Sequence, residues 1–254
     1  MLLETLLAPG ALAVVFQPIY ALRPGGGQDL YGFEALTRGP VGTNAARADI
    51  LFEYVRRKRV EAVVDRVCVD LALQAAVSLP DAACLSLNVH ASTLGRDAGF
   101  TDHLLRRAAE YGVAAERLVV EVVEHSSHWN VFGLKRALEV LRDRGVRTAI
   151  DDLGLGHSNL HMVLESCPQI LKLDRYFVGG AARDAARRGV LRAVQLLAAS
   201  VGAQVVAEGI EHEDDLFAVR AEGIALAQGY LFSRPLPASA FVPAPRSTSL
   251  PVTA

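Results

Sequence analysis

The sequence predicts a single α/β domain built as a (β/α)8 barrel with an antiparallel first strand pairing. Short apolar segments alternate with longer amphipathic ones, several amphipathic segments end at a glycine, and the chain has 254 residues. Buried strands of a parallel sheet are typically short apolar runs, and one α/β barrel typically needs about 250 residues. We therefore expect a closed, mostly parallel sheet surrounded by helices.

The strands are expected where apolar residues run without a helical period. The loop ALRPGGGQD after the first apolar run is too short to hold a crossover helix, so the first two strands should form an antiparallel hairpin. The eight candidate strands are residues 14–19, 31–36, 84–89, 118–123, 148–150, 170–173, 205–207 and 224–227.

The helices are expected between these strands, where apolar residues recur with a helical period. Glycines follow several of the last helical turns, as C-terminal caps do: Gly112, Gly145, Gly202 and Gly223. The candidate helices are residues 48–79 as two helices, 101–111, 132–144, 159–165, 182–201 and 213–222. Around the barrel at 13–237, we expect an N-terminal tail or short helix at 1–12 and a flexible C-terminal tail at 238–254.

Composition and charge exclude several classes of protein. The net charge is −2, and the one basic run, RRKR at 56–59, is expected to be a solvated helix end, so binding to duplex nucleic acid is not expected. No segment offers the roughly 18 uncharged apolar residues that a membrane span needs, and the opening residues make a poor signal peptide. Three widely spaced cysteines without a CxxC pair argue against zinc and disulfides, so a cytoplasmic location is expected.

Polar residues close the apolar strands. In a parallel barrel the carboxyl ends of all strands meet at one face, where active sites are found. Lys172 and Asp174 lie at i and i+2 of one candidate strand and so share a face. The residues expected to converge there are Glu34, Asn88, Glu121, Asp151, Asp152 and Glu208.

This set of residues favours a metal centre. Carboxylates at close range repel each other, and Mg²⁺ or Mn²⁺ relieves the repulsion because these ions prefer carboxylate and amide oxygens. Two metals about 3.5–4 Å apart are typical of phosphoester hydrolysis, with Asp151 as a shared ligand and Lys172 orienting the water. The competing interpretation is that such acids cap the following helices, as Asp152 could do. His90 is expected to be a loop or helix-surface residue.

Eight motifs in order carry a resemblance to a known family. They are FQPIYAL at 16–22, YGFEALTRG at 31–39, LSLNV at 85–89, EVVE at 121–124, IDDLGLGHSNL at 150–160, LKLDRYFV at 171–178, VVAEGIE at 205–211 and QGYLFSRPLP at 228–237. With these motifs the chain resembles the EAL-domain cyclic di-GMP phosphodiesterases. The resemblance covers nearly the whole chain and implies a modified TIM barrel.

The resemblance also implies an activity and a set of site residues. It implies hydrolysis of cyclic di-GMP to linear 5′-pGpG with two Mg²⁺ or Mn²⁺ ions, a hydrogen bond from Lys172 to the nucleophilic water, and Glu208 as general base. The implied metal ligands are Glu34, Asn88, Glu121, Asp151, Asp152 and Glu208. Arg38 would hold a substrate phosphate, Gln17, Asp174 and Gln228 would contact substrate, and Glu124 and Glu211 would support the loop after Asp152.

One loop departs from the family pattern. Family members commonly have DDFG, a small residue and GYSS, where this chain reads DDLGLGHSN from Asp151 onward. In the family this loop couples the metal site to dimerisation, so a homodimer through the loop and helix after Asp152 is expected. Two alternatives stay open: a catalytically weak or inactive domain that acts as a cyclic di-GMP receptor or protein-interaction module, and a different two-metal phosphoesterase.

Overall fold

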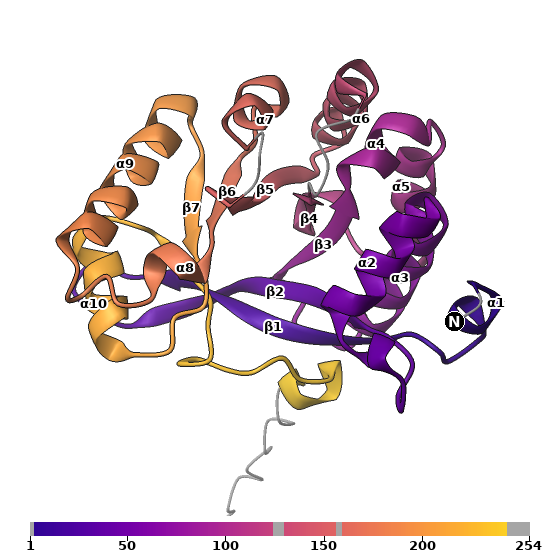
Figure 1. Cartoon of the computed structure of the whole chain (residues 1–254), viewed down its shortest axis with the longest axis horizontal. Helices are drawn as coiled ribbons and strands as arrows, with labels where there is room; N and C mark the ends of the chain where they lie inside the picture. Colours follow the sequence, from indigo (N-terminus) through magenta and orange to yellow (C-terminus); the bar gives the residue numbers. More distant parts are fainter. Residues whose placement is uncertain (1–2, 124–129, 156–158, 243–254) are drawn as a thin grey trace, which may run out of the picture.

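A computed structural model describes residues 3–123, 130–155 and 159–242, and its strands close into a barrel in chain order (Figure 1). β1 is antiparallel to β2, as predicted, and also antiparallel to β8, while the other neighbouring strands are parallel. The strands are β1 Ala13–Leu22, β2 Gln28–Arg38, β3 Cys84–His90, β4 Leu118–Val123, β5 Arg147–Leu153, β6 Ile170–Leu173, β7 Gln204–Ala207 and β8 Leu226–Ala227.

Helices surround the barrel (Figure 1). The predicted helix at 182–201 begins at Ala185 instead, because Asp184 caps it by accepting hydrogen bonds from the backbone N–H groups of Ala186 and Arg187. None of the described helices is both long and apolar enough to cross a membrane. The helices are α1 Leu3–Leu7, α2 Ala48–Lys58, α3 Glu61–Ala76, α4 Ala91–Arg96, α5 Phe100–Glu110, α6 Val131–Asp143, α7 Asn159–Ser166, α8 Arg175–Val178, α9 Ala185–Val201 and α10 Glu213–Ala221.

The barrel has two apolar layers. The larger one lies between the strands and the helices, where outward-facing residues such as Leu85 and Leu87 belong to the same buried cluster as Phe100 and Leu104 of α5. The smaller one consists of Ile19, Val119, Ala149, Ile170, Val206 and Leu226, from six different strands. Side chains two positions along a strand share its face. The layer above the smaller cluster therefore holds residues 17, 121, 151, 172, 208 and 228.

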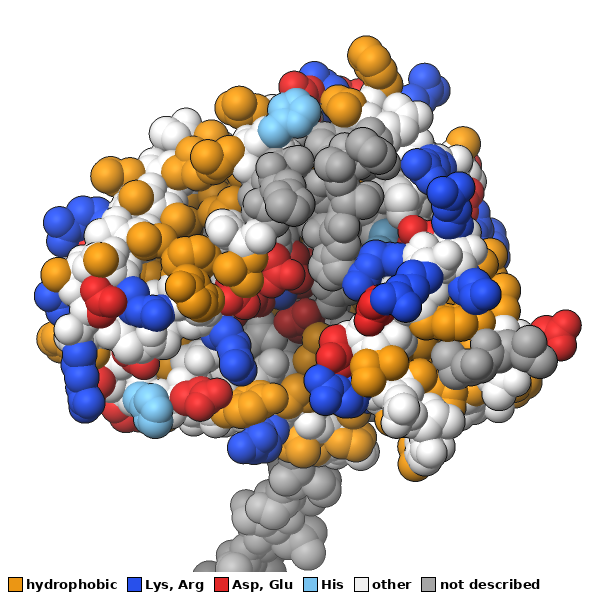
Figure 2. Space-filling model, in the orientation of Figure 1, with side chains coloured by type: hydrophobic (Ala, Val, Ile, Leu, Met, Phe, Trp, Pro, Cys, Tyr) orange, Lys and Arg blue, Asp and Glu red, His pale blue; other side chains and the backbone are white. Residues whose placement is uncertain are grey.

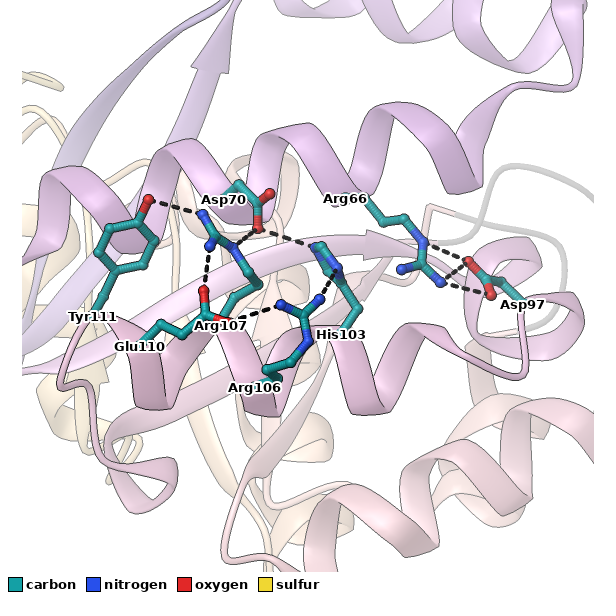
Figure 3. Close-up of polar contacts among 8 residues, drawn as sticks. All are labelled: Arg66, Asp70, Asp97, His103, Arg106, Arg107, Glu110 and Tyr111. Carbon is teal, nitrogen blue, oxygen red and sulfur yellow. Dashed lines mark hydrogen bonds and ion pairs between the residues drawn. The ribbon is translucent and has the colours of Figure 1, made fainter.

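Charged contacts fix α3 against α5 (Figure 3). Arg107 of α5 donates from Nε to Asp70 of α3 at 2.9 Å, and His103 of α5 approaches the same carboxylate at 3.0 Å. Arg66 of α3 forms a two-point contact with Asp97, which follows α4, with both N···O distances at 2.9 Å. Paired guanidinium–carboxylate contacts have a defined geometry, so they hold these helices in register at the side of the barrel.

We expect Asp215→Ala to destabilise the chain more than Asp214→Ala. Asp215 is buried in α10 and accepts backbone hydrogen bonds from Gly180 and Ala182 at 3.1 and 3.3 Å. Removing its carboxylate leaves these two backbone N–H groups without an acceptor, which costs about 1–3 kcal/mol in the free energy of unfolding. Asp214 is exposed, and among the described residues its side chain pairs only with Arg183, at 3.4 Å. Urea unfolding of both variants checks this, and equal losses would contradict the assignment.

Candidate metal centre

Lys172 lies at the centre of the polar layer of the barrel. Its side chain is 1% exposed, and its Nζ lies 2.6 Å from Glu121 Oε2 and 2.7 Å from Glu208 Oε1. The same Nζ lies 3.2 Å from Glu34 Oε2 and 3.5 Å from Asp151 Oδ1. Strands β2, β4, β5 and β6 and the residue after β7 thus bring one ammonium group and four carboxylates together.

Amide side chains fix the orientation of Glu34. Asn88 on β3 donates from Nδ2 to Glu34 Oε1 at 2.9 Å, and Gln228 donates from Nε2 to Glu34 Oε2 at 2.8 Å. Gln228 Nε2 also donates to Gln17 Oε1 at 3.1 Å, and Gln17 donates to the Ser233 carbonyl. The carboxylate of Glu34 therefore accepts from Asn88 on one oxygen and from Gln228 on the other, and Gln17 extends the network on the Gln228 side.

The ionisation of the pair at the centre follows from these contacts. Burial alone would lower the pKa of Lys172, but the charges of Asp151, Glu121, Glu208 and Glu34 raise it well above its ordinary value. Burial acts to raise the pKa of Glu34, yet Lys172 and the amide hydrogen bonds bring it below its ordinary value. Both shifts favour the charged forms, so Lys172 and Glu34 form an ion pair at neutral pH.

The remaining acids carry more negative charge than Lys172 balances. Burial raises the pKa of Glu121 to about 8, with Glu34 and Asp151 adding to the rise and Lys172 opposing it. Burial and the charges of Asp151 and Asp174 raise the pKa of Asp152 to about 6. Burial also raises the pKa of Glu208 well above its ordinary value, and Lys172 opposes that rise. Raised carboxylate pKa values are what a cluster short of positive charge shows.

Three of these acids converge in a way that suits a metal ion. One oxygen each from Asp151, Asp152 and Glu208 lies within 4.8 Å of the other two. The β5–β6 pairing shifts between Ile150 and Leu153, and Asp152 has a φ of 51°, in the left-handed region. Such backbone strain is found where a site requires it. Oxygen donors of this kind fit Mg²⁺ or Mn²⁺, with Asn88 adding an amide oxygen.

Two cavities flank the cluster and share Glu34, Leu36 and Asp151 as lining residues. The first, of about 310 Å³, lies beside β2, β3, α2 and α3 and is also lined by Asn88, Asp152 and Arg38. Figure 2 shows acidic side chains gathered in a hollow at the middle of this face. The second, of about 230 Å³, is also lined by Gln17, Lys172, Asp174, Glu208, Glu211 and Gln228.

The structure locates all but one of the predicted site residues in or beside this hollow. Glu124 lies outside the described residues. Asp174 lines the second cavity and also caps α8, accepting from the Tyr176 N–H at 2.7 Å. Glu211 is exposed at the rim of the second cavity. The competing interpretation of Asp152 as a helix cap is wrong, because Asp152 lies within β5, well before the start of α7 at Asn159.

One sequence prediction about the first cavity is wrong. His90 is not a surface residue: it is 7% exposed and its Nδ1 lies 2.8 Å from the buried Asp65 carboxylate. The basic run at 56–59 lies at the end of α2 with its last three residues exposed, as predicted, whereas Arg56 is half-buried and lines the first cavity together with Phe52. The sequence indicated that His90 lies on the same face of its strand as Asn88, because the two residues are two positions apart. A second signal was Asp65, a carboxylate inside the apolar run VVDRV.

Comparison with known proteins gives the family. Residues 2–235 match the EAL domain. The chain belongs to the EAL domain family. NbdA, a cyclic di-GMP phosphodiesterase of Pseudomonas aeruginosa, is 32% identical to this EAL chain. The match covers 94% of this chain and 30% of NbdA. The EAL chain spans about a third of the length of the curated relatives that it matches.

Solved EAL structures have the same barrel. A standalone EAL protein of Vibrio cholerae with cyclic di-GMP bound is 26% identical, with a TM-score of 0.78 over 89% of this chain and 92% of that one. The Klebsiella pneumoniae protein BlrP1, in a complex with manganese and cyclic di-GMP, is also 26% identical, with a TM-score of 0.76 over 91% of this chain and 57% of that one.

The raised pKa of Asp152 predicts a pH-dependent stability difference. A carboxyl group whose pKa rises on folding, here from 3.8 to about 6, contributes stability below about pH 4 that is lost as the pH rises through 6. Asp152→Asn cannot ionise, so its Tm in EDTA should rise relative to wild type between pH 4 and 7. Thermal unfolding across this range tests the prediction, and a constant Tm difference would contradict it.

Replacing Lys172 should cost stability that a divalent cation partly restores. Lys172→Met leaves buried carboxylates without their cation, which costs between about 3 and 5 kcal/mol in the free energy of unfolding. The matched control is Lys135→Met, because Lys135 is half-exposed and lies 3.8 Å from Glu165. We expect denaturation in EDTA to show the loss only for Lys172→Met, with partial recovery in Mn²⁺. Equal stability of the two variants would contradict this role of Lys172.

Proposed function

We propose that this chain is a metal-dependent phosphodiesterase that hydrolyses cyclic di-GMP to linear 5′-pGpG. The observation that carries the proposal is the convergence of Asp151, Asp152 and Glu208 beside a buried Lys172, at the bottom of a hollow with a cavity on each side. Membership of the EAL domain family supports it, as does the relative NbdA, which is named as a cyclic di-GMP phosphodiesterase.

The proposed cofactor is a pair of Mg²⁺ or Mn²⁺ ions. The residues that would hold them are the oxygen donors of the cluster. When bound, such ions act as Lewis acids toward phosphoryl oxygens and make water more acidic. The manganese complex of BlrP1 supports this choice of metal. The proposed ligands are Glu34, Asn88, Glu121, Asp151, Asp152 and Glu208.

The chain's own residues would orient the reactants and move the proton. Lys172, whose Nζ lies between Glu121 and Glu208, would donate an N–H to the attacking water and fix its direction. Glu208 would accept the proton of that water as general base, because its Oε1 lies 2.7 Å from the Lys172 Nζ that would hold the water. Arg38, which donates only to the adjacent Thr37 carbonyl among the described residues, would bind a phosphate.

Further roles complete the proposal. Gln17, Asp174 and Gln228 line the second cavity and would contact the substrate there. Glu124 and Glu211 would support the loop after Asp152. We also propose a homodimer through this loop and α7, because Leu160 and Leu164 of α7 are 64% and 72% exposed. The catalytic unit would be residues 13–237, between the tails 1–12 and 238–254.

The activity is tested by incubating the chain with cyclic di-GMP and Mg²⁺ or Mn²⁺ and separating pGpG by chromatography. Asp151→Asn should lower kcat by at least about 100-fold, because it removes charge where the phosphate reacts. Asp184→Asn, on the exposed cap of α9, should keep the wild-type rate. EDTA should abolish turnover.

Other outcomes favour the alternatives. Tight binding of cyclic di-GMP without pGpG, with metals supplied, would favour a receptor that has lost turnover. This alternative rests on the altered DDLGLGHSN sequence after β5. Hydrolysis of other phosphodiesters in preference to cyclic di-GMP would favour a different two-metal phosphoesterase.

A further inference from the structure

The short helix α8 lies between the two segments that carry Asp152 and Glu208. It follows β6 directly, and Asp174 caps it by accepting from the Tyr176 N–H at 2.7 Å. On one side β6 pairs with β5, which contains Asp152, and on the other side it pairs with β7, which Glu208 follows. The chain that leaves β6 therefore emerges between two of the three acids that converge.

The ring of Phe177 on α8 packs against the backbone two residues after Asp152. Gly154 has a φ of 99°, and a Cβ atom placed on it would lie only 2.7 Å from Phe177 Cε2 and 2.8 Å from Phe177 Cζ. The ring is half-buried and packs against the main apolar core, which limits its movement. Asp152 has a φ of 51°, and such backbone persists only where surrounding contacts hold it. Phe177 supplies a contact of this kind.

The start of α8 also meets the residue that follows Glu208. A Cβ atom on Gly209 would overlap with Arg175 Cβ and lie 3.3 Å from Arg175 Cα, so the backbone of α8 leaves no room for a side chain there. The Glu208 N–H donates to the carbonyl of Leu173, the last residue of β6, at 3.0 Å. The Glu208 side of α8 is therefore fixed through the backbone, whereas its Asp152 side depends on the ring of Phe177.

We propose that α8 is a spacer between these two segments and that Phe177 is a positioning residue, which holds Asp152 toward Glu208 through Gly154. The inference rests on the proposed function, because it concerns residues that would hold the proposed metal ions. Phe177 lines neither cavity beside the acidic cluster, so it acts through the backbone. Without the ring, the backbone at Gly154 is free to move toward α8, and the Asp152 carboxylate moves with it. Removing a group that orients a metal ligand typically weakens metal binding.

The test measures Mn²⁺ binding to the whole chain by isothermal titration calorimetry, without substrate. Phe177→Ala should weaken binding between about 10- and 100-fold. Phe177→Leu, which keeps a large side chain against Gly154, should retain most of the affinity. The matched control is Tyr111→Ala, because Tyr111 is also half-buried and packs its ring against the same core. Tyr111 lies between α5 and β4, at the barrel face opposite the strand carboxyl ends, so this variant should bind Mn²⁺ as wild type does.

Gly154→Ala gives a second measurement of the same contact. In the wild-type background the added Cβ meets the Phe177 ring and also strains the backbone, because the φ of Gly154 is 99°. In the Phe177→Ala background only the backbone strain remains. The loss of Mn²⁺ affinity caused by Gly154→Ala should therefore be smaller in that background. Equal losses in both backgrounds would show that Phe177 does not act through Gly154 and would overturn the inference.

The outcomes separate this inference from the proposed function. Wild-type Mn²⁺ affinity in Phe177→Ala overturns the positioning role and leaves the proposed function intact. Equal weakening in Phe177→Ala and Tyr111→Ala also overturns it, because it indicates a general effect of lost packing. A wild type that binds no Mn²⁺ overturns the proposed function and the positioning role together. Circular dichroism of each variant shows that the fold is intact.

Discussion

Lys172 carries a buried positive charge at the centre of the barrel, with the carboxylates of Glu34, Glu121, Asp151 and Glu208 around it. A lone ion of either sign in this position would pay a large desolvation cost, so neither Lys172 nor its partners would be tolerated without the other. Because one cation cannot balance four carboxylates, the same arrangement leaves a net negative site. The same residues therefore stabilise the fold and retain affinity for further cations.

The alternation of β-strands explains why so much of this site could be predicted from the sequence. The apolar residues Val119, Ala149, Ile170 and Val206 fill one level inside the barrel, and the residues two positions later form the next level. A polar residue inside an apolar strand, such as Glu121 in LVVEVV, is visible in the sequence and has few explanations other than a site. The six candidate ligands followed from this pattern, whereas the antiparallel hairpin followed from the short loop ALRPGGGQD.

Other parts could not be predicted, because they depend on contacts between elements distant in the chain. The antiparallel pairing of β1 with β8 rests on a two-residue strand, too short to have a pattern of its own. The contact of His90 with Asp65 joins residues 25 positions apart, and the sequence of neither segment indicates that it contacts the other. Arg56 sits in a basic run whose other members are exposed, so only packing against the barrel distinguishes it. Pairwise contacts of this kind need the folded chain.

The reversed direction of β1 has a consequence for where the chain enters the barrel. In an all-parallel barrel the first strand starts at the face opposite the strand carboxyl ends, but β1 starts beside Arg38, at the carboxyl end of β2. The return segment meets it there, with Phe16 and Leu236 exchanging backbone hydrogen bonds at 2.7 and 2.9 Å. Both ends of the barrel domain thus emerge at the rim that carries the acidic cluster. A segment joined directly to either end would start on the face of the barrel that carries the acidic cluster.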